Sequence, residues 1–271
     1  MVTKGDGAAR RYAPGVQKIG AHVAPDHPLK IAEELGADQV QIFLSDPQSF
    51  KKPPPRHDAD ELIASPIDIV VHAPYLINVC SPKSNVRYGS RNVLKSTCEA
   101  AALIKAKAIV VHGGHSEDAV DEGFGRWVRT LETLESDVPL YIENTPGGKN
   151  AVAKRVEDIA RLWDAIDKAK TDVKVGFCFD TCHAHAAGED LADVAELIIG
   201  ITGGIDLVHC NDSKDEFGSG RDRHTNLGKG QIPPGAMRHM LAAANAPVIC
   251  ETPGSTDDVA LDLAFVRDAL S

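Results

Sequence analysis

Short apolar runs alternate with longer segments of helical periodicity along nearly the whole sequence. Each run is rich in β-branched and aliphatic residues and has the length of a single strand, whereas the following segments carry apolar residues at helical spacing. Eight strands are predicted: Lys18–Val23, Gln39–Leu44, Ile67–His72, Ala108–His112, Leu140–Glu143, Val173–Asp180, Leu207–Asn211 and Val248–Glu251. The predicted helices include Arg91–Ala106, Gly123–Leu134, Val156–Lys168, Leu191–Ile199, Pro234–Ala244 and Asp257–Leu270.

This alternation predicts the fold class. Strands that are apolar on both faces are typical of parallel sheets covered by helices, and eight β-α units favour a closed (β/α)8 TIM barrel over a six-stranded open sheet. A chain of 271 residues is long enough for one such barrel. Because no shift in composition marks an internal boundary, we predict a single domain over residues 16–271, preceded by a flexible N-terminal tail over residues 1–15.

Metal-ligating residue types stand at the ends of the predicted strands. In a (β/α)8 barrel these ends meet on one face, so residues far apart in sequence share a pocket there. A single histidine in such a place is more often structural than a ligand, but a series of such side chains indicates a site. The series consists of His22, His72, His112, Glu143, Asp180, His209 and Glu251.

The segment from Gly176 to Gly188 carries Asp180 and His183, three residues apart at a strand end. This spacing lets a carboxylate and an imidazole serve two neighbouring metals. The alternative is that Asp180 caps a short turn and that the histidine is structural. His185 in the same segment is interpreted as a bystander, because no other feature of the sequence requires it.

The segment Val208–Gly230 is too long and polar to be a simple turn, and loops of this length are usually functional or disordered. Its residues Asp222 and His224 can both reach one ion if the backbone between them is extended. A solvated loop of mixed charge is the plain alternative. The same loop carries cations suited to phosphate contacts, namely Lys214, Arg221, Arg223 and Lys229.

The inventory of candidate ligands contains five histidines, two aspartates and two glutamates, without a thiolate. Nitrogen and oxygen ligands of this kind suit Zn²⁺ or Mn²⁺, and they suffice for three ions if one carboxylate bridges two of them. Such a cluster activates water and neutralises charge on a phosphoryl group. The candidates are His72, His112, Glu143, Asp180, His183, His209, Asp222, His224 and Glu251.

Composition argues against several classes of protein. The net charge of −10 argues against binding nucleic acid through overall attraction, although a local basic rim can still do so. No apolar stretch approaches the roughly 18 residues of a membrane span, and the N-terminal segment lacks the apolar core of a signal peptide. The six cysteines form no C-x-x-C pair, so buried thiols are expected. These features predict a cytoplasmic protein without a membrane partner.

Together, these segments resemble the endonuclease IV family of apurinic/apyrimidinic (AP) DNA-repair endonucleases. The likeness runs in order and spacing from Lys18 to the end of the chain, through GAHV, QIF, HAPYLIN, VVHGGH, IENTPGG, FDTCHAHAAG, HCNDSKDEFGSGRDRHTNLGKGQI and CETP. It implies a barrel with three zinc ions that cleaves double-stranded DNA on the 5′ side of abasic sites and trims blocked 3′ ends. We expect a monomer, associated with the nucleoid when it acts on DNA.

The resemblance also implies a role for each candidate ligand. A hydroxide between the first two ions would attack phosphorus, with Glu251 orienting or deprotonating it, while the third ion would stabilise the leaving 3′ oxygen. Manganese could replace zinc at one or more positions. The implied ligands are His72, His112 and Glu143 at the first ion; Glu143, Asp180, His209 and Glu251 at the second; and His183, Asp222 and His224 at the third.

The resemblance implies DNA contacts with one departure from the family pattern. Tyr75 matches an aromatic residue that enters the DNA at the lesion, and Arg223 lies where a phosphate-contacting arginine is expected, with Lys214 and Arg221 nearby. The family often carries a minor-groove arginine in the loop after the second strand, but residues 45–50 offer Gln48 instead. Because wedge residues fill the stack vacated by a flipped nucleotide, Gln48 is expected to affect DNA binding more than chemistry.

Two other hypotheses stay open. A sugar isomerase or epimerase on the related xylose-isomerase-like barrel binds one divalent ion at four strand ends, a pattern that Glu143, Asp180, His209 and Glu251 satisfy. The other five candidate ligands have no role in such an enzyme. A non-catalytic metal-binding or DNA-binding module would need the same ligands but no open coordination position.

Overall fold

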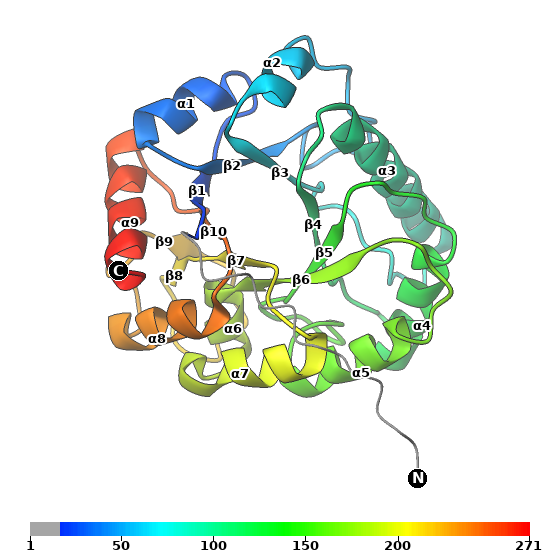
Figure 1. Ribbon diagram of the computed structural model, residues 1–271. Helices are drawn as coiled ribbons and strands as arrows, with labels where there is room; N and C mark the ends of the chain where they lie inside the picture. The colour runs from blue at the N-terminus through cyan, green and yellow to red at the C-terminus, as the bar shows by residue number, and fades with distance from the viewer. Residues whose placement is uncertain (1–16) are drawn as a thin grey trace.

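Eight parallel strands close into a barrel in the computed structural model, which describes residues 17–271 (Figure 1). Each barrel strand pairs with its neighbour in sequence order, and β10 closes the ring by pairing with β1. The predicted TIM barrel is confirmed, while the tail predicted over residues 1–15 lies outside the described residues. The barrel strands are β1 (Ile19–His22), β2 (Gln39–Phe43), β3 (Asp68–His72), β4 (Ala108–His112), β5 (Leu140–Glu143), β6 (Val175–Asp180), β7 (Leu207–His209) and β10 (Val248–Cys250).

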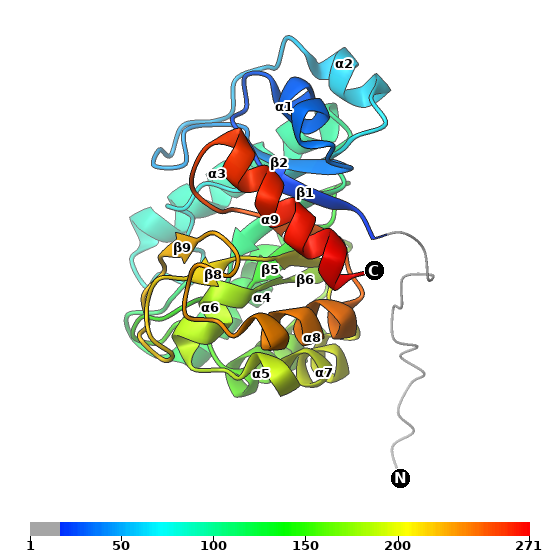
Figure 2. The same ribbon diagram turned by 90° about the vertical axis from the view of Figure 1, so that its left-hand side faces the viewer.

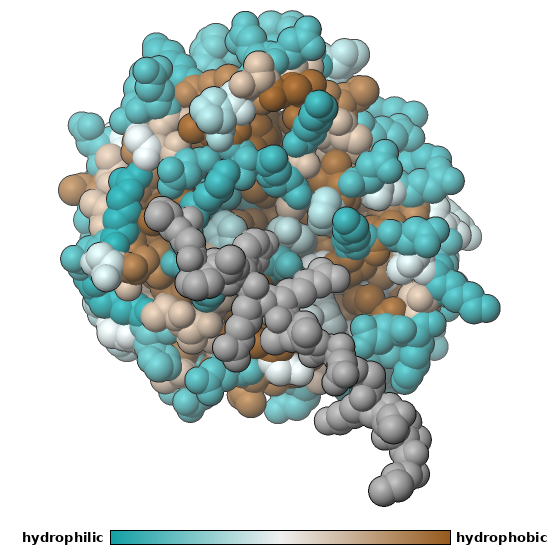
Figure 3. Space-filling model, viewed as in Figure 1, coloured by the Kyte–Doolittle hydropathy of each residue, from teal (hydrophilic) through white to brown (hydrophobic). Residues whose placement is uncertain are grey.

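Helices surround the barrel and connect its strands (Figure 1). On the face seen in Figure 3, hydrophilic side chains cover much of this outer ring, and hydrophobic ones show between them. No helix in the described part of the chain is long and apolar enough to cross a bilayer. The helices of the ring are α1 (Pro28–Leu35), α2 (Ala59–Ala64), α3 (Ser84–Leu103), α4 (Val120–Leu131), α5 (Val156–Ile166), α7 (Leu191–Thr202), α8 (Pro234–Ala244) and α9 (Thr256–Ala269).

Helices α3 and α6 (Thr181–Ala187) show where the helix prediction falls short. Helix α3 begins at Ser84, well before the predicted start at Arg91, because its first turns are polar, include Gly89 and lack apolar periodicity. Helix α6 directly follows β6 and is not predicted at all. Every residue of α6 is buried, so the helix has no polar face to mark it in the sequence.

A small hairpin interrupts the β-α alternation. Strands β8 (Asp212–Ser213) and β9 (His224–Thr225) pair in antiparallel fashion within the long segment between β7 and α8. Figure 2 shows the hairpin beside α6, which β8 contacts. The Asp212 carboxylate orders the chain after the hairpin, because it accepts hydrogen bonds from the backbone N–H groups of Gly228, Gly230 and Ile232 at 2.9 to 3.0 Å. The long polar segment is therefore ordered structure.

Apolar side chains fill both sides of the barrel strands. The larger group lies between the strands and the ring of helices, and it includes Trp127, Leu131 and Leu162. A smaller group fills the inside of the barrel. All six cysteines are buried and free, as the sequence predicts. The inner group consists of Val70, Ala108, Val110, Cys178, Leu207 and Ile249, with Tyr141 packed against it.

Gly20 marks a close approach between β1 and β2. A Cβ atom at this position would overlap the carbonyl oxygen of Gln39 and lie 2.6 Å from its carbonyl carbon. Gln39 is the residue that pairs with Gly20 in the two strands, so neither backbone can move without disturbing the barrel. A Cβ atom at Gly200 on α7, by contrast, would meet no atom within 4 Å.

We therefore expect Gly20→Ala to destabilise the protein by roughly 1–3 kcal/mol through overpacking. The matched change Gly200→Ala should stabilise it by about 0.5–1 kcal/mol, because alanine loses less backbone entropy in a helix. Urea unfolding followed by circular dichroism measures both changes in the free energy of unfolding. A Gly20→Ala variant as stable as the wild type would contradict the close approach of β1 and β2.

Candidate metal centre

The pleat of the barrel strands places six candidate ligands in one layer. Successive side chains point to opposite faces of a strand, so a residue two positions beyond an interior residue is again interior. Six of the inner side chains just described are each followed, two positions later, by a candidate ligand at the carboxyl end of the strand or directly after it. These ligands are His72, His112, Glu143, Asp180, His209 and Glu251.

Glu143 lies at the centre of this layer and is completely buried. Its Oε2 lies 3.3 Å from Nε2 of His72 and 3.3 Å from Nε2 of His112. Its Oε1 lies 3.2 Å from Nδ1 of His183 and 3.2 Å from Nδ1 of His209. Because each oxygen faces two imidazoles, the carboxylate has the geometry of a ligand shared between two ions.

Asp180 and Glu251 extend the cluster on the side of His209. Glu251 Oε2 lies 3.3 Å from Nδ1 of His209, and the ligand atoms of these three residues and Glu143 all lie within 4.8 Å of one another. Asp180 is also the N-cap of α6, where its Oδ1 accepts a hydrogen bond of 2.6 Å from the backbone N–H of His183. Capping and ligation are compatible, because the cap does not use Oδ2, which accepts one hydrogen bond from Asn211 and keeps a second lone pair.

A second group of ligands lies between α6 and the β8–β9 hairpin. The Asp222 carboxylate lies 3.2 Å from Nε2 of His183 and 3.0 Å from Nε2 of His224. Neither buried nitrogen makes a hydrogen bond of acceptable geometry with the described part of the chain. The Asp222 side chain is 43% exposed, so this group lies at the open side of the cluster.

Hydrogen bonds orient the imidazoles as metal ligands. His72 Nδ1 donates to the carbonyl of Ala73 at 2.7 Å, so Nε2 is the ring nitrogen that faces Glu143. His183 Nδ1 lies 2.9 Å from the carbonyl of Asn144, and His224 Nδ1 lies 3.3 Å from that of Glu251, so in both rings Nε2 points into the cluster. Metal-ligating histidines typically have one ring nitrogen fixed in this way. The two unpartnered Nε2 atoms and the nitrogen and oxygen donor set fit divalent cations.

The cluster shifts the pKa values of its members. Burial raises the pKa of Glu143, but the nearby His112 and His209 outweigh this effect and hold that pKa well below its usual value. Against the effect of burial, His209 and His22 also lower the pKa of Glu251. Burial lowers the pKa of His112 to about 4, so its imidazole is neutral at pH 7, the form that ligates a metal.

The aromatic residue expected at the lesion stands at the rim of the cluster. Tyr75 is 52% exposed and stacks on the ring of His112 with centroids 5.7 Å apart. It also packs edge-on against Phe43 and His72. An exposed ring held by neighbouring rings can receive a base or sugar without losing much side-chain entropy.

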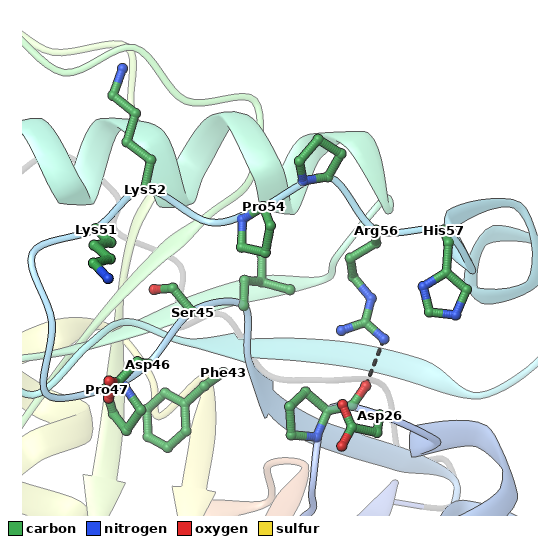
Figure 4. Close-up of a pocket in the computed structure, with 13 residues that line it drawn as sticks. Asp26, Phe43, Ser45, Asp46, Pro47, Lys51, Lys52, Pro54, Arg56 and His57 are labelled. Carbon is green, nitrogen blue, oxygen red and sulfur yellow. Dashed lines mark hydrogen bonds between the residues drawn. The ribbon is translucent and has the colours of Figure 1, made fainter.

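A pocket of 610 Å³ opens beside Phe43, between the loops that follow β1 and β2 (Figure 4). Gln48 lies in the second of these loops and is exposed. Sequence reasoning missed Lys51 and Lys52, which line this pocket and form no ion pair within residues 17–271. Arg56, which also lines it, is instead held by Asp58 at 2.6 Å. The loop thus carries two lysines, Lys51 and Lys52. They lie three and four residues beyond Gln48, the position where the family pattern has arginine.

The three cations expected near the second ligand group differ in whether they form ion pairs. Arg223 Nε donates to Asp215 Oδ2 at 2.7 Å, and Nη2 of the same guanidinium pairs with Oδ1. Arg221 Nη1 lies 3.5 Å from the same carboxylate. Lys214 is exposed and forms no ion pair with the described residues. All three cations therefore lie on the hairpin that carries Asp222, but only the lysine is unpaired.

Comparison with known proteins gives the family of this chain. The model of the xylose isomerase-like TIM barrel family matches residues 29–269. The "Probable endonuclease 4" of Mycobacterium bovis is 56% identical over 254 residues, which cover 92% of this chain and 98% of that protein. Its counterpart in Mycobacterium leprae is 55% identical over 257 residues, covering 93% and 99%. The chain belongs to the endonuclease IV family.

Solved structures include a member of the same family at lower sequence identity. Endonuclease IV from Thermus thermophilus is 28% identical, with a TM-score of 0.79, over 93% of this chain and 98% of that one. A D-tagatose 3-epimerase-like protein reaches a TM-score of 0.75 at 21% identity, over 93% of this chain and 97% of that one, which is a likeness of fold alone. The predictions of an endonuclease IV family member and of a nuclease are confirmed.

Side-chain amides that sequence reasoning missed support the ligands in this endonuclease IV family member. Gln41 accepts a hydrogen bond from Nε2 of His209 at 2.9 Å and donates to Glu251 at 2.7 Å. Asn211 donates to Asp180 Oδ2 at 2.7 Å and accepts from the backbone N–H of Glu251 at 2.8 Å. The only sequence signal for such residues is an amide one or two places from a strand end. Cys182 was also missed, and its sulfur lies within a possible ligand group.

We expect Gln41→Met to weaken metal binding by roughly 10- to 100-fold, because His209 and Glu251 lose the group that orients them. Gln39→Met is the matched control on the same strand, since Gln39 is also buried and its side-chain amide donates to the carbonyls of Lys18 and Val248, at 3.1 and 2.9 Å, away from the candidate ligands. Competition with a chromophoric chelator measures the affinity of each variant. Equal affinities in the two variants would contradict the orienting role of Gln41.

Proposed function

We propose that this chain is a zinc-dependent AP endonuclease that hydrolyses double-stranded DNA on the 5′ side of abasic sites and removes blocking groups from 3′ ends. Membership of the endonuclease IV family supports the activity on DNA. One observation carries the proposal, namely the group of His183, Asp222 and His224, which lies beside the inner ligands and has no role in a one-metal barrel enzyme. We expect the enzyme to act as a monomer in the cytoplasm, on DNA of the nucleoid.

The ligand geometry supports three ions. Nitrogen and oxygen ligands without thiolate suit zinc, with manganese as the alternative. When bound, the ions would supply an activated water and positive charge on both sides of the phosphorus atom. The proposed ligands of the first ion are His72, His112 and Glu143, whose Oε2 lies 3.3 Å from each imidazole. Those of the second are Glu143, Asp180, His209 and Glu251, and those of the third are His183, Asp222 and His224.

Two carboxylates would carry the proton and charge chemistry of the reaction. Glu251 is 12% exposed, whereas Glu143 is fully buried, so an attacking water can reach the first but not the second. Glu251 would orient this water and take its proton as the water oxygen bonds to phosphorus and the bond to the 3′ oxygen breaks. Glu143 would fix the spacing of the first two ions, since both its oxygens face imidazoles.

Contacts close to the site would supply the affinity for DNA. The net charge of −10 repels the DNA backbone at long range, so binding must rest on local cations and stacking. Lys214, Arg221 and Arg223 lie in the loop that carries Asp222, and Tyr75 offers an exposed ring stacked on His112. Gln48 can fill space in the minor groove but brings no charge.

A single-metal sugar isomerase or epimerase is the second candidate. Glu143, Asp180, His209 and Glu251 form one group whose ligand atoms lie within 4.8 Å of one another, which supports a one-metal site. The endonuclease names of the 56% identical relatives argue against this candidate. Metal content distinguishes the two functions.

Metal analysis with an abasic-site assay tests the proposed function. The purified protein should carry about three zinc or manganese equivalents and cleave a synthetic abasic duplex but not an intact one. Asp222→Ala should lose about one equivalent and most of the cleavage while keeping the circular dichroism spectrum, because the residue is exposed and lies outside the core. One equivalent in the wild type, with no abasic cleavage, would favour the isomerase.

The DNA contacts are tested by titration against abasic and intact duplex at fixed ionic strength. Tyr75→Ala should weaken binding to the abasic duplex by roughly 1–3 kcal/mol, because a stacking contact is lost. Gln48→Ala should weaken it less. Gln48→Arg should tighten binding, because it adds a cation to the narrow groove. If Gln48→Ala proved the more damaging change, residues 45–50 would need a lesion-reading role of their own.

A further inference from the structure

The strand that carries Asp222 presents two different faces. In the hairpin, Ser213 pairs with His224, and the backbone N–H of Lys214 donates to the carbonyl of Arg223 at 3.0 Å, so the extended pairing continues past β9. Side chains alternate along such a backbone. Asp222 and His224 accordingly face the metal cluster, while Arg221 and Arg223 face the other way, toward Asp215.

Asp215 is the anchor of this second face. Its side chain is only 7% exposed, and both carboxylate oxygens are engaged by the guanidinium of Arg223. A forked contact of this kind fixes direction as well as distance. The backbone N–H of Asp215 donates to Ser213 Oγ at 3.2 Å, so the residue that holds Arg223 is itself held to β8.

His185 ties the same loop to α6. The ring of this buried residue donates through Nε2 to the carbonyl of Asp215 at 3.1 Å and contacts Phe217, with ring centroids 5.5 Å apart. Its own carbonyl accepts from the N–H of Gly218 at 3.0 Å, and the carbonyl of Ala186 accepts from Gly220 at 2.8 Å. His185 is therefore a structural residue, as the sequence predicts, and it packs the loop onto the helix that supplies His183.

We propose that Asp215, acting through Arg223, is a positioning residue that sets the register of the loop strand so that Asp222 faces His183 and His224. The proposal rests on the third metal position of the proposed function. A shift of one residue would turn Asp222 away and direct an arginine at the site, since strand register has a period of two. Arg223 thereby acquires a role besides the phosphate contact expected from the sequence.

The test compares metal binding in three variants of the full chain. Zinc titration against a chromophoric chelator should show the weakest of about three equivalents bound at least roughly 10-fold more weakly in Asp215→Asn and in Arg223→Ala, with the other two unchanged. The double variant should be no worse than either single one, because both changes break the same clamp. If Asp215 and Arg223 contributed only to general stability, the effects of the two single changes would add in the double variant. The affinity for all ions would then fall.

Two controls make the outcome decisive. Asp58→Asn breaks a matched forked pair, Arg56 with Asp58, outside the cluster, and it should leave zinc binding unchanged. Asp222→Ala defines the signal for loss of the third ion. If Asp222→Ala loses that ion while the Asp215 and Arg223 variants retain it with wild-type affinity, the positioning proposal is overturned and Arg223 is a DNA contact only. If Asp222→Ala itself retains every ion, the third site of the proposed function fails instead.

Discussion

The burial of one carboxylate among imidazoles is the interaction on which this site depends. Glu143 has no exposed surface, and an isolated buried carboxylate would be too costly to keep ionised. Its neighbours come from β3, β4, α6 and β7, so no local segment can supply the compensation. Only the closed barrel brings them within hydrogen-bonding distance of one side chain. The stabilisation of the buried Glu143 carboxylate thus depends on the topology of the fold.

The apolar layer beneath the cluster determines where the ligands point. Side chains such as Val70, Val110 and Ile249 fill the inside of the barrel, and the residue two positions after each of them is a candidate ligand. A shift of register by one residue would send both an apolar side chain and a ligand to the helix side. Core packing and the placement of the candidate ligands therefore select the same register.

The strand pattern predicts most of the centre because strand ends are easy to locate. All six candidate ligands at the ends of the barrel strands stand where a short apolar run gives way to a loop, and the barrel brings those places together. The residues that hydrogen-bond to these candidate ligands are harder to predict from the sequence. Gln41 and Asn211 are ordinary amides in the sequence, and their role depends on partners far along the chain. Helix α6 is hidden for a different reason, since its complete burial removes the amphipathic period.

The two parts of the cluster differ in how they are held. The inner ligands sit on paired strands inside the barrel, where packing leaves them little freedom, and Glu143 is fully buried there. Asp222 comes from a loop and is 43% exposed, so packing alone cannot fix it. An exposed ligand leaves room for a substrate oxygen at its ion, but a mobile one would weaken the ion's binding. A loop strand anchored on its far face, as by Asp215 and His185, reconciles the two needs: the anchor lies away from the cluster, and the side facing the substrate stays open.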